Sequence, residues 1–427
     1  MSLPDDQLVE HTVSERSQLR LSGLSPREIQ FLRQLEDESK ITLRLGERPN
    51  EVLLLTRMHC GVVQAGRHRI FIEPKVPTKN LLYLVESTYV SPDIDFYDQA
   101  SYARGRNFLE ILLHYFYGRV EQLISRGLYR SYMTEIANTS LVRGRIDVSR
   151  TIKENFASPH KVICEYDQYT EDVIENRIIR YTLEVTRNLA TTPSLRRKLV
   201  KLLASFAEVS NPGRLSTDTF RRMVYHRLNR HYQAIHEFCK VLLTGTAIEI
   251  PSGPVGFRAF LVNMEQLFQE FLFATMARSP EFADYQLRRQ SSSRIVWLRG
   301  SGLVRDITVV PDIKVSNSMD VLVVDAKYKN PLVARMNRWI PVSSDVYQMM
   351  AYCVAHGCSG ALVYPKTLVT DSDIDEIYEI RGSESIFKLK SVDLAGDLRQ
   401  LKAACYELCL NLRRFVETGR TLVATQS

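Results

Sequence analysis

The sequence predicts an α/β fold of the multidomain α+β kind, with a β-rich N-terminal domain, a helical middle region and a C-terminal mixed sheet flanked by helices. Short strand-like runs between polar breaks fill the chain up to about residue 95. Apolar residues then recur at helical spacing from about 100 to 245. Strand-like runs and helices alternate after that. We therefore divide the 427 residues into domains 1–98, 99–245 and 246–427.

The first domain owes its β-rich character to four runs of β-branched and apolar residues. Gly66 with Arg67 and His68 is expected to form a hairpin tip between two of these runs, and Pro74 marks the end of the strand region. An early helix is expected near Pro26–Glu38. The four runs are Ile41–Leu45, Glu51–Thr56, Gly61–Gln64 and Arg69–Ile72.

The middle region follows a helical pattern. Apolar residues between Phe108 and Ile124 recur every three or four positions, and Gly127 is expected to end that helix. A shorter piece is expected around Leu141–Ile152. Three further helices are expected at Asp172–Ala190, Pro193–Ser210 and Asp218–Leu243.

The order of elements changes after the segment Thr244–Phe257, which is rich in Gly and Pro and is expected to be a boundary or hinge. Beyond it, helices and strand-like runs indicate a mixed sheet. The expected elements are Leu261–Ala277, Tyr285–Arg289, Ile295–Leu298, Leu303–Val310, Val321–Ala326, Asp345–His356, Ala361–Tyr364, Ile386–Leu394 and Leu394–Thr418.

Composition narrows the class of protein. The net charge of +7 mildly favours an anionic partner. The seven Cys contain no CxxC pair, which argues against a zinc site and a disulfide framework. The N-terminus lacks the basic and apolar regions of a signal peptide, and no window holds 18 consecutive apolar residues. We expect a cytoplasmic protein without a membrane span.

The residues that suggest chemistry lie at the ends of two apolar runs. The first run ends in Pro311-Asp312, and the second, Val321–Asp325, continues into Ala326 and Lys327. Because side chains alternate along a strand, Asp325 and Lys327 point to one face, and Asp312 reaches it if the two strands pair. Two carboxylates and a carbonyl, here that of Ala326, are the hard oxygen ligands that Mg²⁺ prefers.

Such a group of residues suits phosphodiester hydrolysis. A metal ion activates water and offsets charge on the phosphate, and a lysine such as Lys327 orients the attacking water. The ordinary interpretation is that two acids and a lysine meet near strand ends by chance. A downstream helix adds Gln348 and Tyr352, which share a face because they lie four residues apart. They would lie at the edge of the metal site, unless they are incidental polar residues of a buried helix.

These residues resemble the PD-(D/E)xK nuclease core: Pro311-Asp312, then Asp325-Ala326-Lys327, then a helix with Gln348 and Tyr352. The helix is similar to that of the RecB-like branch, and the rest of the chain resembles the McrC family. The resemblance implies a restriction-endonuclease-like C-terminal domain. Further McrC-like segments are Gly61–Val63, Ile70–Lys75, Leu141–Ile146, Cys164–Asp172, Asn176–Arg177 and Met264–Phe271.

The resemblance implies a Mg²⁺-dependent DNA endonuclease subunit, with Mn²⁺ expected to substitute. Its partner would be an AAA+ GTPase hexamer of the McrB type, which binds modified DNA and whose GTP hydrolysis the subunit stimulates. Domain 1–98 would dock onto this motor. Domain 99–245 would be a helical linker, and domain 246–427 would be the nuclease that cuts the DNA. Lys75 would contact the motor or cap a surface turn, and Asn176 and Arg177 would brace the helical domain.

One position departs from the McrC-like pattern. The family's entry helix carries an acid directly after Leu267-Phe268, where it can complete the metal site, and this chain has Gln269. Glu265 or Glu270 is expected to replace it, with Glu265 taken as the additional metal ligand, unless both are ordinary surface acids. Two alternatives therefore stay open: an activator of the GTPase with a degenerate centre, and a stand-alone RecB-like repair nuclease.

Overall fold

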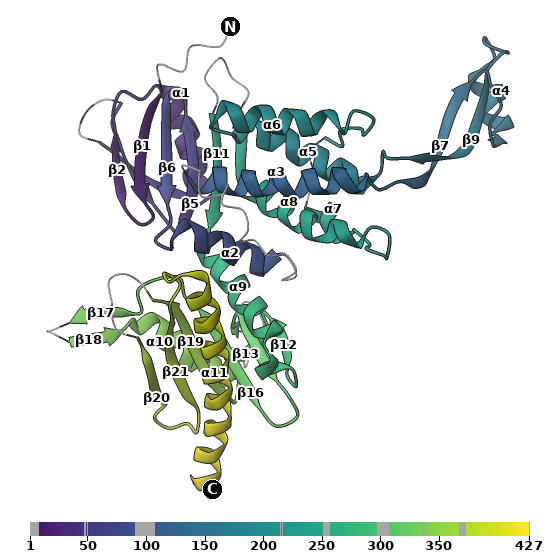
Figure 1. The fold of residues 1–427 in the computed structure, drawn as a ribbon. Helices are drawn as coiled ribbons and strands as arrows, with labels where there is room; N and C mark the ends of the chain where they lie inside the picture. Colours follow the sequence, from purple (N-terminus) through teal and green to yellow (C-terminus); the bar gives the residue numbers. More distant parts are fainter. Residues whose placement is uncertain are drawn as a thin grey trace, which may run out of the picture. The chain divides into compact units, whose positions relative to one another are not determined.

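The computed structural model describes residues 8–89 apart from 47 and 49, 107–250 apart from 214 and 216, and 257–296, 307–335, 338–366 and 373–426. The chain divides into two compact units (Figure 1). Unit 1 combines residues 1–99 with 247–427, and unit 2 comprises residues 100–246. No helix of the described ranges is both long and apolar enough to cross a membrane.

A five-stranded sheet of order β1-β6-β5-β11-β10 forms the N-terminal part of unit 1. The expected hairpin is confirmed: Ala65 faces His68 across a turn in which Gly66 has φ +56°. At Gly61, φ is +144° and a Cβ would lie 1.9 Å from the backbone oxygen of Phe260, so only glycine permits this close pairing of β5 with β11. The strands are β1 Val9–Ser14, β5 His59–Ala65, β6 His68–Glu73, β10 Thr246–Ile250 and β11 Phe257–Asn263.

The pairing of β11 corrects the predicted start of the C-terminal domain. Residues 246–250 and 257–263 belong to the N-terminal sheet, and the helix expected from Leu261 begins at Met264. The side chain of Asn263 caps that helix by accepting from the backbone of Glu265. The error has a physical reason: a short apolar run such as 259–262 fits a buried strand and a buried helix equally well.

A smaller sheet of order β2-β4-β3 and helix α1 close this core. Ser25 caps α1 with a complete capping box, in which Glu28 reaches back to the backbone of Ser25. The predicted helix and runs are confirmed within one or two residues, while β1, β2 and α2 were not anticipated. The elements are β2 Gln18–Leu21, α1 Pro26–Asp37, β3 Ile41–Leu45, β4 Val52–Thr56 and α2 Thr78–Tyr89.

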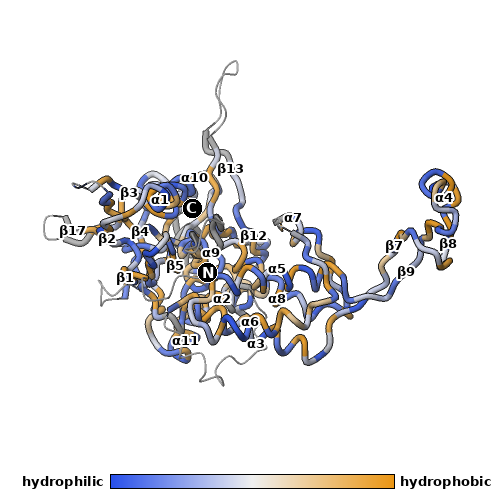
Figure 2. The backbone as a smooth tube through the Cα atoms, turned by 90° about the horizontal axis from the view of Figure 1, so that it is seen from above, coloured by the Kyte–Doolittle hydropathy of each residue, from blue (hydrophilic) through white to orange (hydrophobic). Residues whose placement is uncertain are grey.

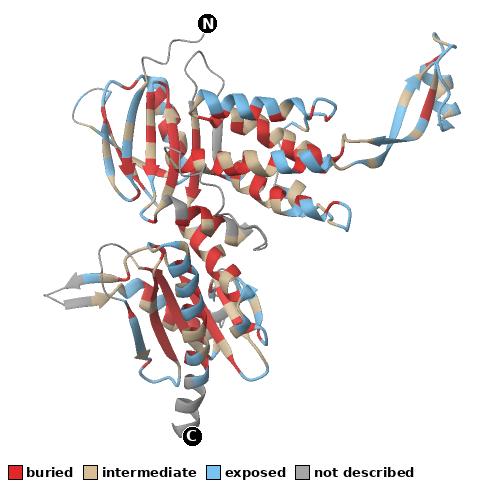
Figure 3. Ribbon diagram, in the orientation of Figure 1, coloured by how far each residue is buried: buried red, intermediate tan, exposed pale blue. Residues whose placement is uncertain are grey.

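The C-terminal part of unit 1 contains a six-stranded mixed sheet of order β12-β15-β16-β19-β21-β20, as predicted. Its central strands, β16 and β19, are parallel and almost entirely buried (Figure 3). The strands are β12 Gln286–Arg289, β15 Ile313–Ser316, β16 Val321–Ala326, β19 Ser359–Pro365, β20 Asp375–Glu379 and β21 Ile386–Val392. Two hairpins flank the sheet: β13 Ser293–Val296 with β14 Ile307–Val309, and β17 Leu332–Arg335 with β18 Arg338–Pro341.

Helices pack against this sheet. Met349, Tyr352 and Cys353 of α10 join a core with Val323 of β16 and Leu362 of β19. The helices are α9 Met264–Arg278, α10 Ser343–His356 and α11 Leu398–Gln426, with a 3-10 turn at Pro280–Phe282.

Unit 2 has a helical body in which α5 packs against α6 and α8, and α3 against α6 and α8. The first predicted helix is confirmed, with Gly127 at its C-terminal cap. The long helix expected over Asp218–Leu243 is wrong, because two helices separated by a 3-10 turn replace it. The elements are α3 Phe108–Arg126, α5 Ile174–Leu189, α6 Pro193–Ala204, α7 Thr217–Arg221, the turn Arg230–Tyr232 and α8 Gln233–Gly245.

A β-arm, defined here as residues 131–170, extends from this helical body (Figures 1 and 2). It consists of β7 Ser131–Thr139, β8 Arg145–Ile146, α4 Val148–Glu154 and β9 Val162–Thr170, with sheet order β7-β9-β8. The expectation of a purely helical middle region is therefore wrong here. No residue of β7 or α4 is buried, so no apolar face marked these elements in the sequence.

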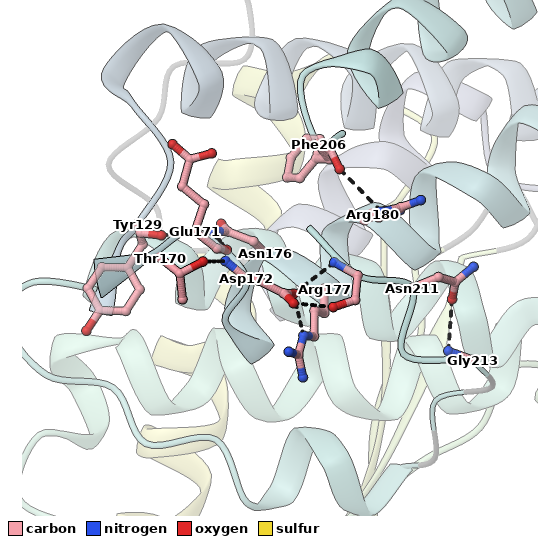
Figure 4. A network of polar contacts seen from close by, with 11 residues as sticks. Tyr129, Thr170, Glu171, Asp172, Asn176, Arg177, Arg180, Phe206, Asn211 and Gly213 are labelled. Carbon is pink, nitrogen blue, oxygen red and sulfur yellow. Dashed lines mark hydrogen bonds and ion pairs between the residues drawn. The ribbon is translucent and has the colours of Figure 1, made fainter. Parts of the chain in front are cut away.

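The base of the β-arm is fixed to the helices by a polar network (Figure 4). Asn176 donates to the carbonyl oxygens of Tyr129 and Glu171 at 2.8 and 2.7 Å. Arg177 Nε lies 2.6 Å from Asp172, and this ion pair lowers the pKa of the Asp172 carboxyl to about 2. The prediction that Asn176 and Arg177 brace the helical domain is thereby confirmed.

Candidate metal-dependent catalytic site

The two predicted aspartates meet at one end of the six-stranded sheet. β15 and β16 pair antiparallel with Ile313 opposite Val324, so the next residues outward, Asp312 and Asp325, face each other. The Oδ2 atom of Asp312 accepts from the backbone N–H of Ala326 at 2.9 Å. Asp312 lies directly before β15. The described part of the predicted strand Leu303–Val310 forms β14, Ile307–Val309, and residues 303–306 lie outside the described residues.

Lys327 follows β16 and joins the two aspartates. Its Nζ lies 2.8 Å from Oδ2 of Asp325, and its own backbone N–H donates to Val363 of β19 at 2.9 Å. This backbone bond extends the β16 pairing beyond Ala326, so alternation places the side chains of Asp325 and Lys327 on the same face of the sheet. The structure thus brings together Asp312, Asp325, Ala326 and Lys327 as the sequence predicts.

Burial and nearby negative charge disfavour the charged forms of Asp312 and Asp325. Burial, followed by the charge of Asp325, raises the pKa of Asp312 well above its usual value. Burial also raises the pKa of Asp325, although the neighbouring Lys327 opposes this shift. Burial lowers the pKa of Lys327, but the charge of Asp325 outweighs it, so the net shift is upward. Two buried carboxyl groups close together therefore call for more positive charge than Lys327 supplies.

The oxygen atoms present fit a divalent cation. The buried Oδ2 of Asp325 forms an ion pair with Lys327 Nζ at 2.8 Å but accepts no hydrogen bond of regular geometry among the described residues. Two buried carboxylates share this one ammonium, and a bound cation would offset the remaining negative charge. Carboxylate and carbonyl oxygens are the donors that Mg²⁺ prefers. Asp312, Asp325 and the carbonyl of Ala326 are thus suitable ligands.

Gln348 and Tyr352 adjoin the aspartates as the sequence predicts. Gln348 Nε2 donates to the Tyr352 hydroxyl at 2.6 Å, and that hydroxyl donates to the carbonyl of Val310 at 3.2 Å. Burial, and then the charges of Asp325 and Asp312, raise the pKa of Tyr352. The Tyr352 ring packs into the core of the sheet, while Gln348 is exposed.

The expected third acid is not brought to the pair. Within the described ranges, no three His, Cys, Asp or Glu side chains gather as a metal site would need. Glu265 lies in the first turn of α9, and Glu270 forms an ion pair with Arg289 of β12. Gln269 lies between them, partly buried. Glu265 as a metal ligand therefore stays a prediction.

Asp345 is an acid near the site that sequence reasoning missed. It lies buried in the first turn of α10 and accepts from Lys329 Nζ at 2.6 Å and from the Tyr364 hydroxyl at 2.8 Å. Its charge is among the causes that raise the pKa of Asp325. Its position one turn before Gln348, on the same helix, was the signal that could have found it.

Comparison with known proteins identifies the family. The sequence model of a family described as "McrBC 5-methylcytosine restriction system component" matches residues 54–365 of this chain, which is most of its length. That range includes Asp312, Asp325, Lys327, Gln348 and Tyr352, so the site lies inside the matched part. The class defined by this match is that of restriction-system components. The chain belongs to the McrBC 5-methylcytosine restriction system component family, which confirms the predicted relationship.

The chain is also similar to one curated protein in sequence and to one solved structure in fold. The chain is 26% identical over 329 residues to the "Type IV methyl-directed restriction enzyme EcoKMcrBC" of Escherichia coli (strain K12), covering 73% of this chain and 91% of the relative. A chain from the refined half-complex of the tetradecameric assembly of Thermococcus gammatolerans McrB AAA+ hexamers with bound McrC shares the fold. This similarity has a TM-score of 0.62 at 19% identity, over 95% of this chain and 100% of the other.

Proposed function

We propose that this chain is the Mg²⁺-dependent DNA endonuclease subunit of a McrBC-like restriction system. The observation that carries the proposal is the convergence of Asp312, Asp325 and Lys327 at one sheet edge, where two buried carboxylates share a single ammonium. Family membership supports a role in restriction. The buried, like-charged carboxyl pair supports the metal dependence.

Each residue of the site has a distinct task in phosphodiester hydrolysis. Asp312, Asp325 and the Ala326 carbonyl would hold Mg²⁺, and the bound ion would supply activation of water and compensation of charge on the phosphate. Lys327, fixed by Asp325, orients the attacking water and stabilises negative charge that develops on the phosphate. Tyr352 holds Gln348 in place at the edge of the site, where its exposed amide is available to the DNA backbone.

The partner in this proposal is an AAA+ GTPase hexamer of the McrB type. The structural relative comes from an assembly of McrB AAA+ hexamers with bound McrC, which supports such a partner here. The β-arm supplies an additional candidate contact surface beyond the predicted domain 1–98, because it exposes large apolar side chains that a partner would cover. These include Tyr132 at 70%, Leu141 at 64%, Ile152 at 68% and Phe156 at 92% exposure.

A second function keeps one observation in its favour. Gln269 stands where the resemblance to the McrC family implies an acid, and the described residues bring no third carboxylate to Asp312 and Asp325. An activator of the GTPase that does not cut would have this feature. The stand-alone RecB-like repair nuclease is supported less, because the family match extends well outside the sheet that carries the site.

A cleavage assay on methylated DNA tests the proposal, with Mg²⁺, GTP and the McrB-like partner present. Asp312→Asn and Lys327→Ala should each lower the cleavage rate about a thousandfold, since each group contributes several kcal/mol to stabilising the transition state. Stimulation of the partner's GTP hydrolysis should persist in both variants. The matched control is Glu379→Gln, an exposed carboxylate on β20 of the same sheet, which should cut normally.

Three outcomes would contradict the assignment. Full cleavage by both variants would remove the site from Asp312 and Lys327. GTPase stimulation by the wild-type chain, with no cleavage at any Mg²⁺ or Mn²⁺ concentration, would favour the activator. Cleavage of unmethylated DNA by the isolated chain, independent of GTP, would favour the stand-alone nuclease.

A further inference from the structure

A pocket of about 80 Å³ lies in unit 1 beside the candidate catalytic site. Glu15, Arg16 and Lys75 line it from the N-terminal sheet. Tyr328, Lys329 and Lys366 line it where β16 and β19 end. The C-terminal ends of neighbouring parallel strands are where open α/β sheets usually bind ligands. The pocket therefore lies where a ligand of the nuclease domain is expected.

The lining of the pocket is strongly basic. Arg16, Lys75, Lys329 and Lys366 contribute four cations, and Glu15 is its only acid. Lys329 pairs with Asp345, and Lys366 pairs with the exposed Asp373. Among the residues that the structure describes, the charges of Arg16 and Lys75 both act on the single acid Glu15, so two cations face one carboxyl group. A concave site with surplus positive charge concentrates anions.

Two features of the pocket lining are energetically unfavourable: the backbone conformation of Arg16 and the unpaired carboxylate oxygen of Glu15. Arg16 has φ +55°, a left-handed conformation that is unfavourable for a residue with a side chain, and its Nη2 donates to the carbonyl of Tyr328 at 2.7 Å. Glu15 is fully buried. Its Oε1 accepts from the Lys75 backbone and the Tyr328 hydroxyl, both at 2.8 Å, while its Oε2 has no partner. An orphan oxygen in the wall of a basic pocket indicates a missing ligand or water.

The size of the pocket limits what can bind. One water needs roughly 10–15 Å³ of such volume, so the pocket has room for a small tetrahedral anion with its waters. Drug-sized ligands and cofactors occupy roughly 300–1,000 Å³, so a whole nucleotide does not fit. A phosphate group fits both the volume and the charge.

The pocket is also close in the chain to Lys327 of the candidate site. Lys329 follows Lys327 by two residues, so their Cα atoms are at most about 7 Å apart. That is comparable to the distance between neighbouring phosphates of one nucleic-acid strand. We propose that Arg16, Lys75, Lys329 and Lys366 bind a backbone phosphate of the DNA next to the one that is cut. The proposal rests on the proposed nuclease function for the source of the phosphate.

Glu15 has a defined part in this pocket. Burial raises the pKa of its carboxyl, although the Lys75 backbone and the Tyr328 hydroxyl oppose the shift. Because Oε1 already accepts two hydrogen bonds, a proton on Glu15 belongs on Oε2, from which it can donate to the phosphate. Glu15→Gln keeps an acceptor oxygen for the two donors and adds a permanent N–H donor. It is therefore expected to keep phosphate binding or improve it.

DNA binding by the full-length chain, measured without Mg²⁺ by fluorescence anisotropy at several salt concentrations, tests the proposal. Lys75→Met should lower the slope of log K against log salt by about 0.9 and weaken binding roughly eightfold at 0.1 M salt, as expected for one lost phosphate contact. The matched control is Lys402→Met, an exposed lysine on α11 that does not line the pocket. It should leave the slope unchanged. Melting temperatures check that both variants fold.

A second readout separates DNA from the free ion. Inorganic phosphate, compared with chloride at equal ionic strength, should raise the melting temperature of the wild type and of Glu15→Gln but not of Lys75→Met. An unchanged DNA slope in Lys75→Met, combined with loss of stabilisation by inorganic phosphate, would assign the pocket to the free ion and overturn the DNA proposal. Wild-type behaviour of Lys75→Met in both assays would overturn the pocket itself. Neither readout depends on DNA cleavage. The phosphate-binding proposal can therefore be tested even if the chain proves not to be a nuclease.

Discussion

Strand β16 of unit 1 and the strands of the β-arm in unit 2 all pair with neighbouring strands, but they differ in how much of their surface is buried. β16 is buried on both faces and ends in the charged residues of the candidate site. Strand β7 of the β-arm has no buried residue, and its partner β9 buries only Ile163 and Cys164. Burial fixes the position of Asp325 within a dense core. The side chains of the β-arm are exposed and therefore accessible to a binding partner.

The difference separates two sources of function. A catalytic edge needs groups held within a fraction of an ångström, which packing on both faces supplies. A contact surface needs accessible apolar side chains on a firm base, and the Asn176 and Arg177 contacts provide that base. Variants at the edge should therefore affect chemistry, and variants on the β-arm should affect association.

The sharpest test is removal of one charge from the buried edge. Asp325→Asn should reduce DNA cleavage by about a thousandfold or more, because it removes a proposed metal ligand. The same variant should not lower the melting temperature of the metal-free protein and is expected to raise it, since burial already disfavours the charged form of Asp325. Cleavage assays and thermal melts measure the two effects. A variant that unfolds would show that the carboxylate serves the fold.

The helical body beneath the β-arm should respond strongly to acid. His236 is buried, donates from Nε2 to the carbonyl of Glu175 at 3.0 Å, and accepts from the Tyr225 hydroxyl at Nδ1 at 2.9 Å. Burial lowers its pKa to about 4. A histidine with a lowered folded pKa loses stability as pH falls from about 6.5 to about 4, by up to roughly 3 kcal/mol.

Urea unfolding at pH 7 and pH 4.5 measures this loss. His236→Gln retains an amide donor for the Glu175 carbonyl and cannot titrate, so its free energy of unfolding should change less between the two pH values. An equal loss in the variant and the wild type would place the acid sensitivity elsewhere in the chain.

Apolar residues of the β-arm should matter for association alone. Phe156→Ser is expected to weaken binding of the AAA+ partner by roughly thirtyfold, about 2 kcal/mol, as for an interface anchor. Its melting temperature should stay near the wild-type value, because Phe156 is 92% exposed. Tyr406→Ser, at a 51% exposed aromatic on α11, is the control and should bind normally. Undiminished binding of Phe156→Ser would remove this side chain from the interface.

The smallest effect is expected at the edge of the candidate site. Tyr352→Phe keeps the buried ring but removes the hydroxyl that accepts from Gln348 and donates to Val310. Cleavage should fall roughly three- to tenfold, in line with about 1 kcal/mol for one hydrogen bond. Gln348→Ala should lower the cleavage rate by a similar factor if the Tyr352 hydroxyl acts only by positioning the Gln348 amide. A much larger loss in Tyr352→Phe than in Gln348→Ala would show that the hydroxyl acts directly.

Burial explains which parts of the molecule the sequence could predict. The run Val321–Ala326 matches β16 residue for residue, because a strand with two covered faces is a continuous apolar run. The spacing of Asp325 and Lys327 then follows from strand alternation alone. The β7 and β9 strands were missed because they bury little and show no periodic apolar face.

Long-range contacts explain the other differences. Residues 257–263 were assigned to the nuclease domain because nothing local reveals their pairing with β5. Asp345 becomes significant only through Lys329 and Tyr364, which other segments supply. The phosphate pocket combines Arg16 and Lys75 with the ends of β16 and β19, so no single stretch of sequence indicates it.

The β5–β11 pairing also dictates an order of events during synthesis. Gly61 and Leu261 face each other although two hundred residues separate them, and all of unit 2 lies between. A growing polypeptide that has left the ribosome only as far as α8 has a complete set of unit 2 helices but leaves one side of β5 unpaired. An unpaired central strand invites aggregation. We therefore expect a fragment that ends before residue 257 to yield folded helices beside an insoluble N-terminal sheet.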